Sequence, residues 1–214
     1  MTGVQTCALP ISPPGTVGQI DSIAAVGPEP LRGKIEIVDY DPGWPLQFTC
    51  EAERIRAVLG SSALAIEHTG STSVTGLAAK PIIDIVLTVM DSAREETYAP
   101  AIVSAGYRLA IREPEWFEHR LFKRKEPAVN LHVFSDGCSE VARMKLFRDW
   151  LRSNAADRIL YEQTKRLLAE RHWSFVQNYA DAKTEVITQI VARAHAWAAR
   201  LQPDPRIGAD RESR

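Results

Sequence analysis

Residues 67–85 constrain the fold more than any other stretch of the chain. An apolar run at residues 63–66 leads into them, and a loop of small residues follows at 70–76. A second apolar run, residues 82–89, then contains a single charge, Asp84. A carboxylate inside a buried strand is costly unless it is paired or binds a metal ion. This pattern predicts two strands joined by a loop of the size that holds a phosphate group, with an acidic residue beside it.

The composition narrows the class of protein. The chain has 214 residues, 45% of them hydrophobic and 25% charged, which fits one soluble domain. The formal net charge of −1 gives no general attraction to nucleic acid or to anionic membranes, so we expect neither as a partner. No apolar run approaches the roughly 18 residues that span a bilayer. The three Cys have neither metal-ligand nor disulfide spacing, which favours a cytoplasmic location. The oligomeric state is left open.

The two ends of the chain are set apart from the predicted domain. Residues 4–11 read VQTCALPI, the translation of a common sequencing-adapter string, so we interpret residues 1–12 as an assembly artefact. Residues 13–33 are rich in Pro and Gly and are predicted to be a disordered leader. The charged tail, residues 202–214, is also predicted to be disordered.

The remaining segment, residues 34–201, is predicted to be a single α+β domain. Its first part, 34–137, mixes strands and helices, and its second part, 138–201, is helical. Besides the two strands already described, we expect strands at 34–38, 107–111, 120–124 and 129–134. The expected helices are 46–59, 94–105, 139–152, 157–171 and 181–201, with Ser139 as a candidate N-cap.

The loop and the acid give the first functional candidates. Gly70 and Ser71, directly after a strand, let backbone N–H groups and a hydroxyl approach a phosphate, although such loops also serve simply as turns. Asp84 suits a divalent cation such as Mg²⁺ that bridges substrate phosphates. The alternative is that Asp84 caps nearby N–H groups at the end of a strand. The loop is not a Walker A motif, because the required Lys-Ser/Thr order is absent.

Two histidines are further candidates. His132, on the strand at 129–134, and His68, before the loop, could orient a phosphate, act as acid or base near neutral pH, or ligate a softer divalent ion. The alternative is that each is a core or rim histidine with ordinary partners. His119 and His172 have no supporting context and are predicted to lie at the surface.

The helical segments supply positive charge at regular spacing. Arg148 and Arg152 are four residues apart, and the pattern Tyr-x3-Lys occurs at 161–165 and again at 179–183. An aromatic ring beside a cation can stack on a base while the cation contacts a phosphate. The alternative is solvated helical faces with buried Tyr rings. Arg120 and Lys123 on the preceding strand could join this group.

With these residues in hand, the sequence resembles the GrpB family, which belongs to the nucleotidyltransferase-fold superfamily with DNA polymerase beta. The resemblance covers about residues 34–198, and Thr75 stands where the family usually has Pro. It rests on five blocks, namely 40–45 (YDPGWP), 68–84 (HTGSTSVTGLAAKPIID), 130–134 (NLHVF), 147–152 (FRDWLR) and the Tyr179-x3-Lys183 pair.

The resemblance implies a nucleotidyltransferase-like mixed β-sheet with flanking helices, and a helical C-terminal part that closes the cleft. It implies that the Gly-Ser turn grips a triphosphate and that the following strand bears metal carboxylates. Together with the residue arguments above, this makes Asp84 and His132 the predicted catalytic residues, and Asp84 with Glu67 the predicted ligands for Mg²⁺. The predicted phosphate- or nucleotide-binding residues are His68, Gly70, Ser71, Thr72, Ser73, Lys80, Arg120, Arg148, Arg152, Lys165, Tyr179 and Lys183.

One departure from the wider superfamily bears on catalysis. Active members carry a second acid two residues from the first, yet Ile82 and Val86 flank Asp84 at that spacing. A third acid is expected near His132, which is again not acidic. Two-metal catalysis needs closely spaced anionic ligands. The site could therefore hold one ion, recruit Glu67, or bind a ligand without catalysis.

Three functions remain open at this point. The first is transfer of a nucleotidyl group from a nucleoside triphosphate to an unknown acceptor. The second is non-catalytic binding of a nucleotide or another phosphorylated small molecule. The third is an accessory or assembly role with an empty pocket. Some GrpB relatives are fused to dephospho-CoA kinase, and this sequence has no such kinase motif.

Overall fold

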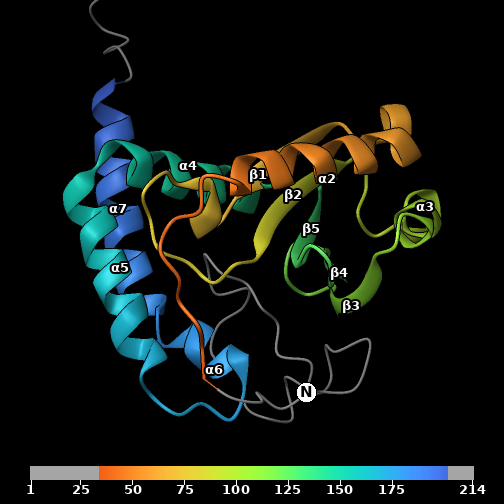
Figure 1. Ribbon diagram of the computed structural model, residues 1–214. Helices are drawn as coiled ribbons and strands as arrows, with labels where there is room; N and C mark the ends of the chain where they lie inside the picture. The colour runs from red at the N-terminus through yellow and green to blue at the C-terminus, as the bar shows by residue number, and fades with distance from the viewer. Residues whose placement is uncertain (1–33, 202–214) are drawn as a thin grey trace, which may run out of the picture.

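A five-stranded mixed β-sheet forms the centre of the molecule. The computed structural model describes residues 34–201 (Figure 1). The strands are β1 (Ala65–Thr69), β2 (Ile83–Val89), β3 (Arg108–Glu113), β4 (His119–Arg124) and β5 (Val129–Ser135). Their order across the sheet is β1-β2-β5-β4-β3, and only the β2–β5 pair is parallel. The α+β prediction is confirmed, whereas those for 1–12, 13–33 and 202–214 lie outside the described residues.

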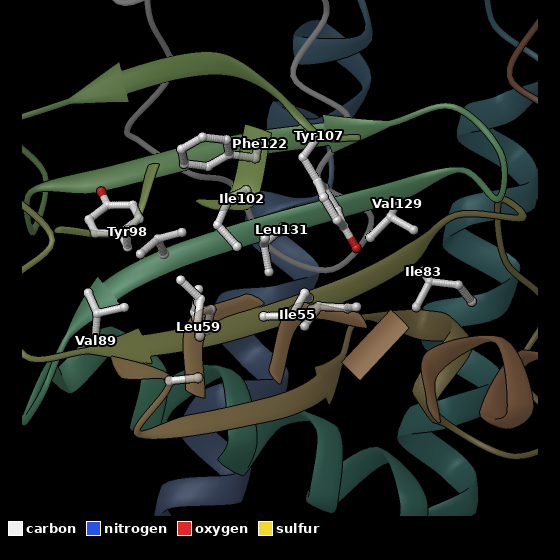
Figure 2. Close-up of a cluster of buried hydrophobic side chains, with 14 of the residues drawn as sticks. Ile55, Leu59, Ile83, Val89, Tyr98, Ile102, Tyr107, Phe122, Val129 and Leu131 are labelled. Carbon is white, nitrogen blue, oxygen red and sulfur yellow. The ribbon is translucent and has the colours of Figure 1, made fainter. Parts of the chain in front are cut away.

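One face of the sheet packs on the first helices. All seven residues of β2 are buried, as its nearly continuous apolar sequence predicts. Alternate residues, such as Ile83 and Ile85, join an apolar core with α2 (Trp44–Leu59) and α3 (Ala99–Ser104). Figure 2 shows side chains from both layers meeting there, among them Ile55 from α2 and Leu131 from β5. Full burial of one such side chain stabilises the fold by about 1.5–3 kcal/mol.

The other face of the sheet carries the polar residues of interest. Asp84, Asn130 and His132 alternate with the core residues on β2 and β5 and therefore point away from α2. The helices α4 (Ser139–Ser153), α5 (Ala155–Ala169) and α7 (Thr184–Leu201) lie together at one side of the sheet (Figure 1). They form a second apolar core with Val86 and Phe134.

The helical part follows its predicted periodicity closely, with one cap misassigned. Asn154 caps α5 by accepting a hydrogen bond from the backbone N–H of Asp157. Ser139 is not the cap of α4, because Cys138 holds that position and no side chain caps the helix. A short helix, α6 (Val176–Asp181), precedes α7 and was not expected from the sequence.

Two other local predictions are wrong. Residues 34–38 do not form a strand, since Val38 alone makes an isolated bridge, with Ala79. The expected helix at 94–105 is divided into a 3-10 turn, η3 (Glu95–Thr97), and α3. Pro100 explains the division, because proline lacks an N–H and is tolerated only in the first turn of a helix.

Candidate functional site

Gly70 and Asp84 are fitted to each other at the end of β1. Gly70 follows this strand with φ +69°, and Thr69 lies opposite Asp84 in the β1–β2 register. A Cβ on Gly70 would lie 2.2 Å from Oδ2 of Asp84, so only glycine admits this carboxylate. The carboxylate is buried, and its Oδ1 accepts a hydrogen bond from Nδ2 of Asn130 at 2.9 Å. Among the described residues, Oδ2 has no hydrogen-bond partner.

Three basic side chains from the helical part contact the end of β1 and the loop that follows it. From α4, Arg148 donates to the carbonyl of His68 at 3.0 Å, and Arg152 donates to the carbonyl of Ser73 at 2.8 and 3.0 Å. From α5, Nζ of Lys165 donates to Oγ of Ser71 at 2.9 Å and also to the carbonyl of Ala78. These contacts join residues 79 to 94 positions apart along the chain and bring three of the predicted cations close to one another.

Burial and two neighbouring arginines affect the titration of His68, which precedes the loop. The pKa of His68 is lowered to about 3, first by burial and then by the charges of Arg152 and Arg148. His68 is therefore neutral at physiological pH. Its ring stacks on Phe48, with the centroids 4.7 Å apart, and Nε2 lies 3.1 Å from Oγ1 of Thr72.

The two Tyr-x3-Lys pairs have a different role from the one predicted for base stacking. Nζ of Lys165 lies 4.8 Å from the ring centroid of Tyr161, and Nζ of Lys183 lies 4.6 Å from that of Tyr179. Each ring therefore holds its own lysine through a cation–π contact. Both tyrosines and both lysines are buried, as is Lys80 at the end of the loop.

Arg120 is not brought to the loop. It lies opposite Val133, on the sheet face that packs against α2 and α3, and its Nε donates to Glu95 at 2.6 Å. Lys123 lies opposite Asn130, on the face that carries Asp84.

The prediction that His119 lies at the surface is wrong. His119 is fully buried at the start of β4, and its Nδ1 lies 2.7 Å from Oε2 of Glu113 on β3. Its Nε2 lies 3.0 Å from Nδ1 of His132 on β5. Nε2 of His132 lies 3.9 Å from Oδ1 of Asp84. A chain of four buried polar groups thus runs from β3 to Asp84, and we call it the His119 chain.

The sequence contains a signal for the His119 chain that the predicted strand bounds left out. Extending the predicted strands 107–111 and 120–124 by one or two residues toward each other makes a hairpin in which Glu113 lies opposite His119. An acidic residue directly opposite a basic one on paired antiparallel strands is a common stabilising arrangement. His172, in contrast, is exposed as predicted.

A groove lies at the other end of β1. Its lining includes Leu64, Thr88, Ser135 and Lys145. Because Ala65 pairs with Thr88 while Thr69 pairs with Asp84, this groove lies at the opposite end of the strand from the loop. It is therefore separate from the predicted phosphate site, although Glu67 also lines it.

Comparison with known proteins settles the family. The profile of the GrpB protein family matches residues 34–193. The chain belongs to the GrpB family.

Relatives of this GrpB chain cover nearly the same region. It is 52% identical to the UPF0157 protein BH1888 of Halalkalibacterium halodurans over 86% of the chain and 95% of that protein. The crystal structure of the conserved protein GrpB from Enterococcus faecalis has 29% identity and a TM-score of 0.68, covering 77% of this chain and 99% of that one. A dephospho-CoA kinase of Mycolicibacterium paratuberculosis is 27% identical over 78% of the chain but only 47% of the kinase.

The residues expected to hold Mg²⁺ in a GrpB protein are only partly available. Glu67 forms ion pairs with Lys145 at 2.8 Å and with Arg148 at 2.9 Å, so its carboxylate is already neutralised. Residues 34–201 contain no group of three or more His, Cys, Asp or Glu placed to hold a metal ion. The donors present therefore do not match the two-ion site of the wider superfamily. Mg²⁺ at Asp84 alone stays a prediction.

No helix within residues 34–201 has the length and apolar character needed to cross a bilayer.

The buried histidines predict that the protein loses stability in mild acid. The pKa of His119 is lowered to about 4, chiefly by burial, and that of His68 to about 3, whereas both lie near 6.5 when unfolded. As the pH falls below about 6.5, the unfolded chain binds protons that the folded chain does not. Each histidine then lowers the free energy of unfolding by up to about 1.4 kcal/mol per pH unit.

This pH dependence is measured by urea unfolding at pH 7, 6 and 5. Carboxylates whose pKa is lowered by ion pairs, such as Glu67 and Asp157, also lower the free energy of unfolding as the pH falls, but only below about pH 4.5. We expect His68→Gln to flatten the profile and the exposed control His172→Gln to leave it unchanged. A wild-type profile that is level from pH 7 to 5 would contradict the assignment.

Proposed function

We propose that this GrpB protein binds a nucleoside triphosphate or another phosphorylated small molecule at the loop of residues 70–80. The observation that carries the proposal is the convergence of Arg152 and Lys165 on that loop from two separate helices, with Arg148 beside them on the carbonyl of His68 in β1. Phosphate groups are recognised by such clusters of cations beside backbone N–H groups and hydroxyls. The dephospho-CoA kinase relatives add coenzyme A precursors to the candidate ligands.

The electrostatics support an anionic ligand. Burial, and after it the charges of Arg152 and Arg148, lower the pKa of His68. The formal net charge of the whole chain is only −1, so this pair of positive charges beside the loop is a local feature. Arg152 is suited to contact a ligand, because 45% of its side chain is exposed while its guanidinium is fixed on Ser73. A guanidinium can bind a phosphate through two parallel hydrogen bonds.

A purely structural role for the same contacts is the competing explanation. The three cations could serve only to fasten β1 and the loop to α4 and α5, since each bonds to a carbonyl or hydroxyl of one or the other. The two explanations differ in what a ligand does. A fastening role predicts loss of stability on mutation with no response to phosphorylated compounds, whereas a binding role predicts stabilisation by the ligand.

The test is a thermal-shift screen of nucleoside triphosphates, coenzyme A precursors and inorganic triphosphate, with and without Mg²⁺. We expect at least one compound to raise the melting temperature of the wild type. Lys165→Met removes a buried ammonium but keeps the length of the side chain, and loss of a charged hydrogen bond should raise Kd about 10- to 100-fold. The exposed control Lys125→Met should leave Kd unchanged.

Two outcomes of the screen would decide against the proposal. If Lys165→Met and Lys125→Met respond to the ligand equally, the loop is not where the ligand binds. If no compound shifts the wild type and a stable protein partner is captured instead, the accessory role is favoured.

Nucleotidyl transfer is the second candidate, and one observation favours it. The carboxylate of Asp84 lies against Gly70, directly beside the loop. An acid on the strand after the loop is what the resemblance to nucleotidyltransferases implies. It predicts pyrophosphate release from a nucleoside triphosphate in the presence of Mg²⁺ or Mn²⁺ and an acceptor. Binding without any pyrophosphate release would leave the protein as a binding module.

A further inference from the structure

The groove at the far end of β1 lies where the two parallel strands, β2 and β5, end. Its lining comes from these strand ends, from the turn at residues 136–138 and from the first turns of α4, so we call it the α4 groove. In open α/β sheets, ligands bind in crevices at the carboxyl ends of parallel strands. The volume of the groove, about 560 Å³, is in the usual range of small-molecule sites. Leu64 and the side chain of Lys145 are 44% and 41% exposed, so the groove is open to solvent.

Thr88 brings to this groove a hydroxyl that the protein itself does not use. On β2, Ile85 and Leu87 join the core with α2, so Thr88 points to the opposite face, where it lines the α4 groove. Only 7% of Thr88 is exposed, and no hydrogen bond joins its hydroxyl to any group of residues 34–201. Since buried polar groups nearly always have a partner, this hydroxyl is suited to a molecule held in the groove.

The N-terminus of α4 opens on the same groove. Residues 138, 139, 141 and 142 all line it. Cys138 holds the cap position, and no side chain accepts a hydrogen bond from the first N–H groups of the helix. The carboxylate of Glu140 is instead held by Arg143, at 2.6 and 2.7 Å. The free N–H groups and the helix dipole together place about half a positive charge at this end of α4, which favours an anion.

The charged side chains of the groove suit a ligand with one negative charge. Glu67 pairs with both Lys145 and Arg148, which leaves this group of three with one positive charge. Asp136, an exposed residue that also lines the groove, offsets that charge. The helix terminus then remains as the positive feature, and it matches a carboxylate better than a phosphate group with a charge of nearly −2. The rest of the lining is largely apolar and includes Leu64, Ala65, Val141 and Ala142.

We propose that the α4 groove is a second binding site, which takes a small carboxylic acid with an apolar body. The hydroxyl of Thr88 and the first N–H groups of α4 donate to the carboxylate, and the apolar lining contacts the hydrocarbon part. The groove lies at the opposite end of β1 from the loop of residues 70–80, so this inference goes beyond the proposed function and does not depend on it.

Alkylation of Cys138 by iodoacetamide reports whether the groove is occupied, because this residue lines it. Cys50, exposed on α2, is the internal reference, and peptide mass spectrometry reads the two positions separately. The probes are the straight-chain acids from acetate to octanoate, benzoate, and the alcohols of the same chain lengths. A ligand of this size binds with a Kd of about 1 mM, so about 10 mM of the best acid should slow the alkylation of Cys138 about tenfold. The alcohols should not slow it, and the rate at Cys50 should not change.

Two variants then test the residues that bind the acid. Thr88→Val keeps the shape of the side chain but removes the hydroxyl, so Kd should rise about three- to tenfold, the effect of losing one neutral hydrogen bond. Thr188→Val, at an exposed position on α7, is the matched control and should leave Kd unchanged. Lys145→Met changes a surface position rather than a core strand, and loss of its positive charge should raise Kd about tenfold.

Three results would overturn the inference. The first is that no acid in the series protects Cys138, and the second is that the alcohols protect it as well as the acids do. The third is that Thr88→Val and Lys145→Met both bind the acid as tightly as Thr188→Val does. Because the loop is tested separately by the thermal-shift screen, none of these results bears on the proposed function.

Discussion

Replacing Gly70 with alanine is expected to lower the free energy of unfolding by about 3 kcal/mol. The added Cβ would lie 2.2 Å from Oδ2 and 2.8 Å from Cβ of Asp84, whose side chain is buried on β2. Overpacking of this kind costs about 1–3 kcal/mol. The backbone at Gly70, with φ +69° and ψ −177°, lies in a region that essentially only glycine adopts, which adds about 1–3 kcal/mol for any other residue. Urea unfolding at pH 7 measures the sum.

Gly76→Ala is the matched control for the backbone contribution. Gly76 also has a positive φ, +77°, but a Cβ there would meet no atom within 4 Å. It should cost only about 1–2 kcal/mol. Repeating Gly70→Ala in an Asp84→Gly background removes the colliding atoms, and the cost should then fall to that of Gly76→Ala. If it does not fall, the collision with Asp84 is not the cause.

Local periodicity predicted the fold well wherever a segment carries its own signal. The apolar run at 82–89 is typical of a buried strand, and the 3.6-residue repeat of α4 and α5 follows from one apolar face. The segment 34–38 alternates polar and apolar residues as a half-buried strand does, yet it has only an isolated bridge through Val38. Alternation shows that a segment can pair, but only the tertiary structure supplies the partner.

The residues of the candidate site were predictable from the sequence, but the contacts among them were not. The loop residues and the cations were identified, but not that Lys165 would meet Ser71 or that Glu67 would be neutralised by Lys145 and Arg148. The His119 chain depends on the strand order β2-β5-β4-β3. Strand order is set by long-range packing, so spacing along one sequence does not reveal which histidines become neighbours.

Asp84 has the features of a residue retained for function at a cost in stability. Its carboxylate is buried, one oxygen accepts from Asn130, and the other has no hydrogen-bond partner among the described residues. An unsatisfied buried polar atom costs about 1–3 kcal/mol, and more when it is charged. A neutral side chain of the same shape would keep the bond to Asn130 and avoid the burial of charge. Residues at binding sites often show this opposition between stability and activity.

We therefore expect Asp84→Asn to raise the free energy of unfolding by about 1 kcal/mol while weakening ligand binding about 10- to 100-fold. The gain comes from removing a buried charge, and the loss comes from removing the carboxylate that lies against Gly70, beside the proposed binding loop. Urea unfolding measures the first effect and titration with the nucleotide found in the screen measures the second. Asp136→Asn, at an exposed position after β5, should change neither. A variant that is less stable and binds the nucleotide as the wild type does would show that Asp84 is a structural residue, since only a functional acid gives the two changes in opposite directions.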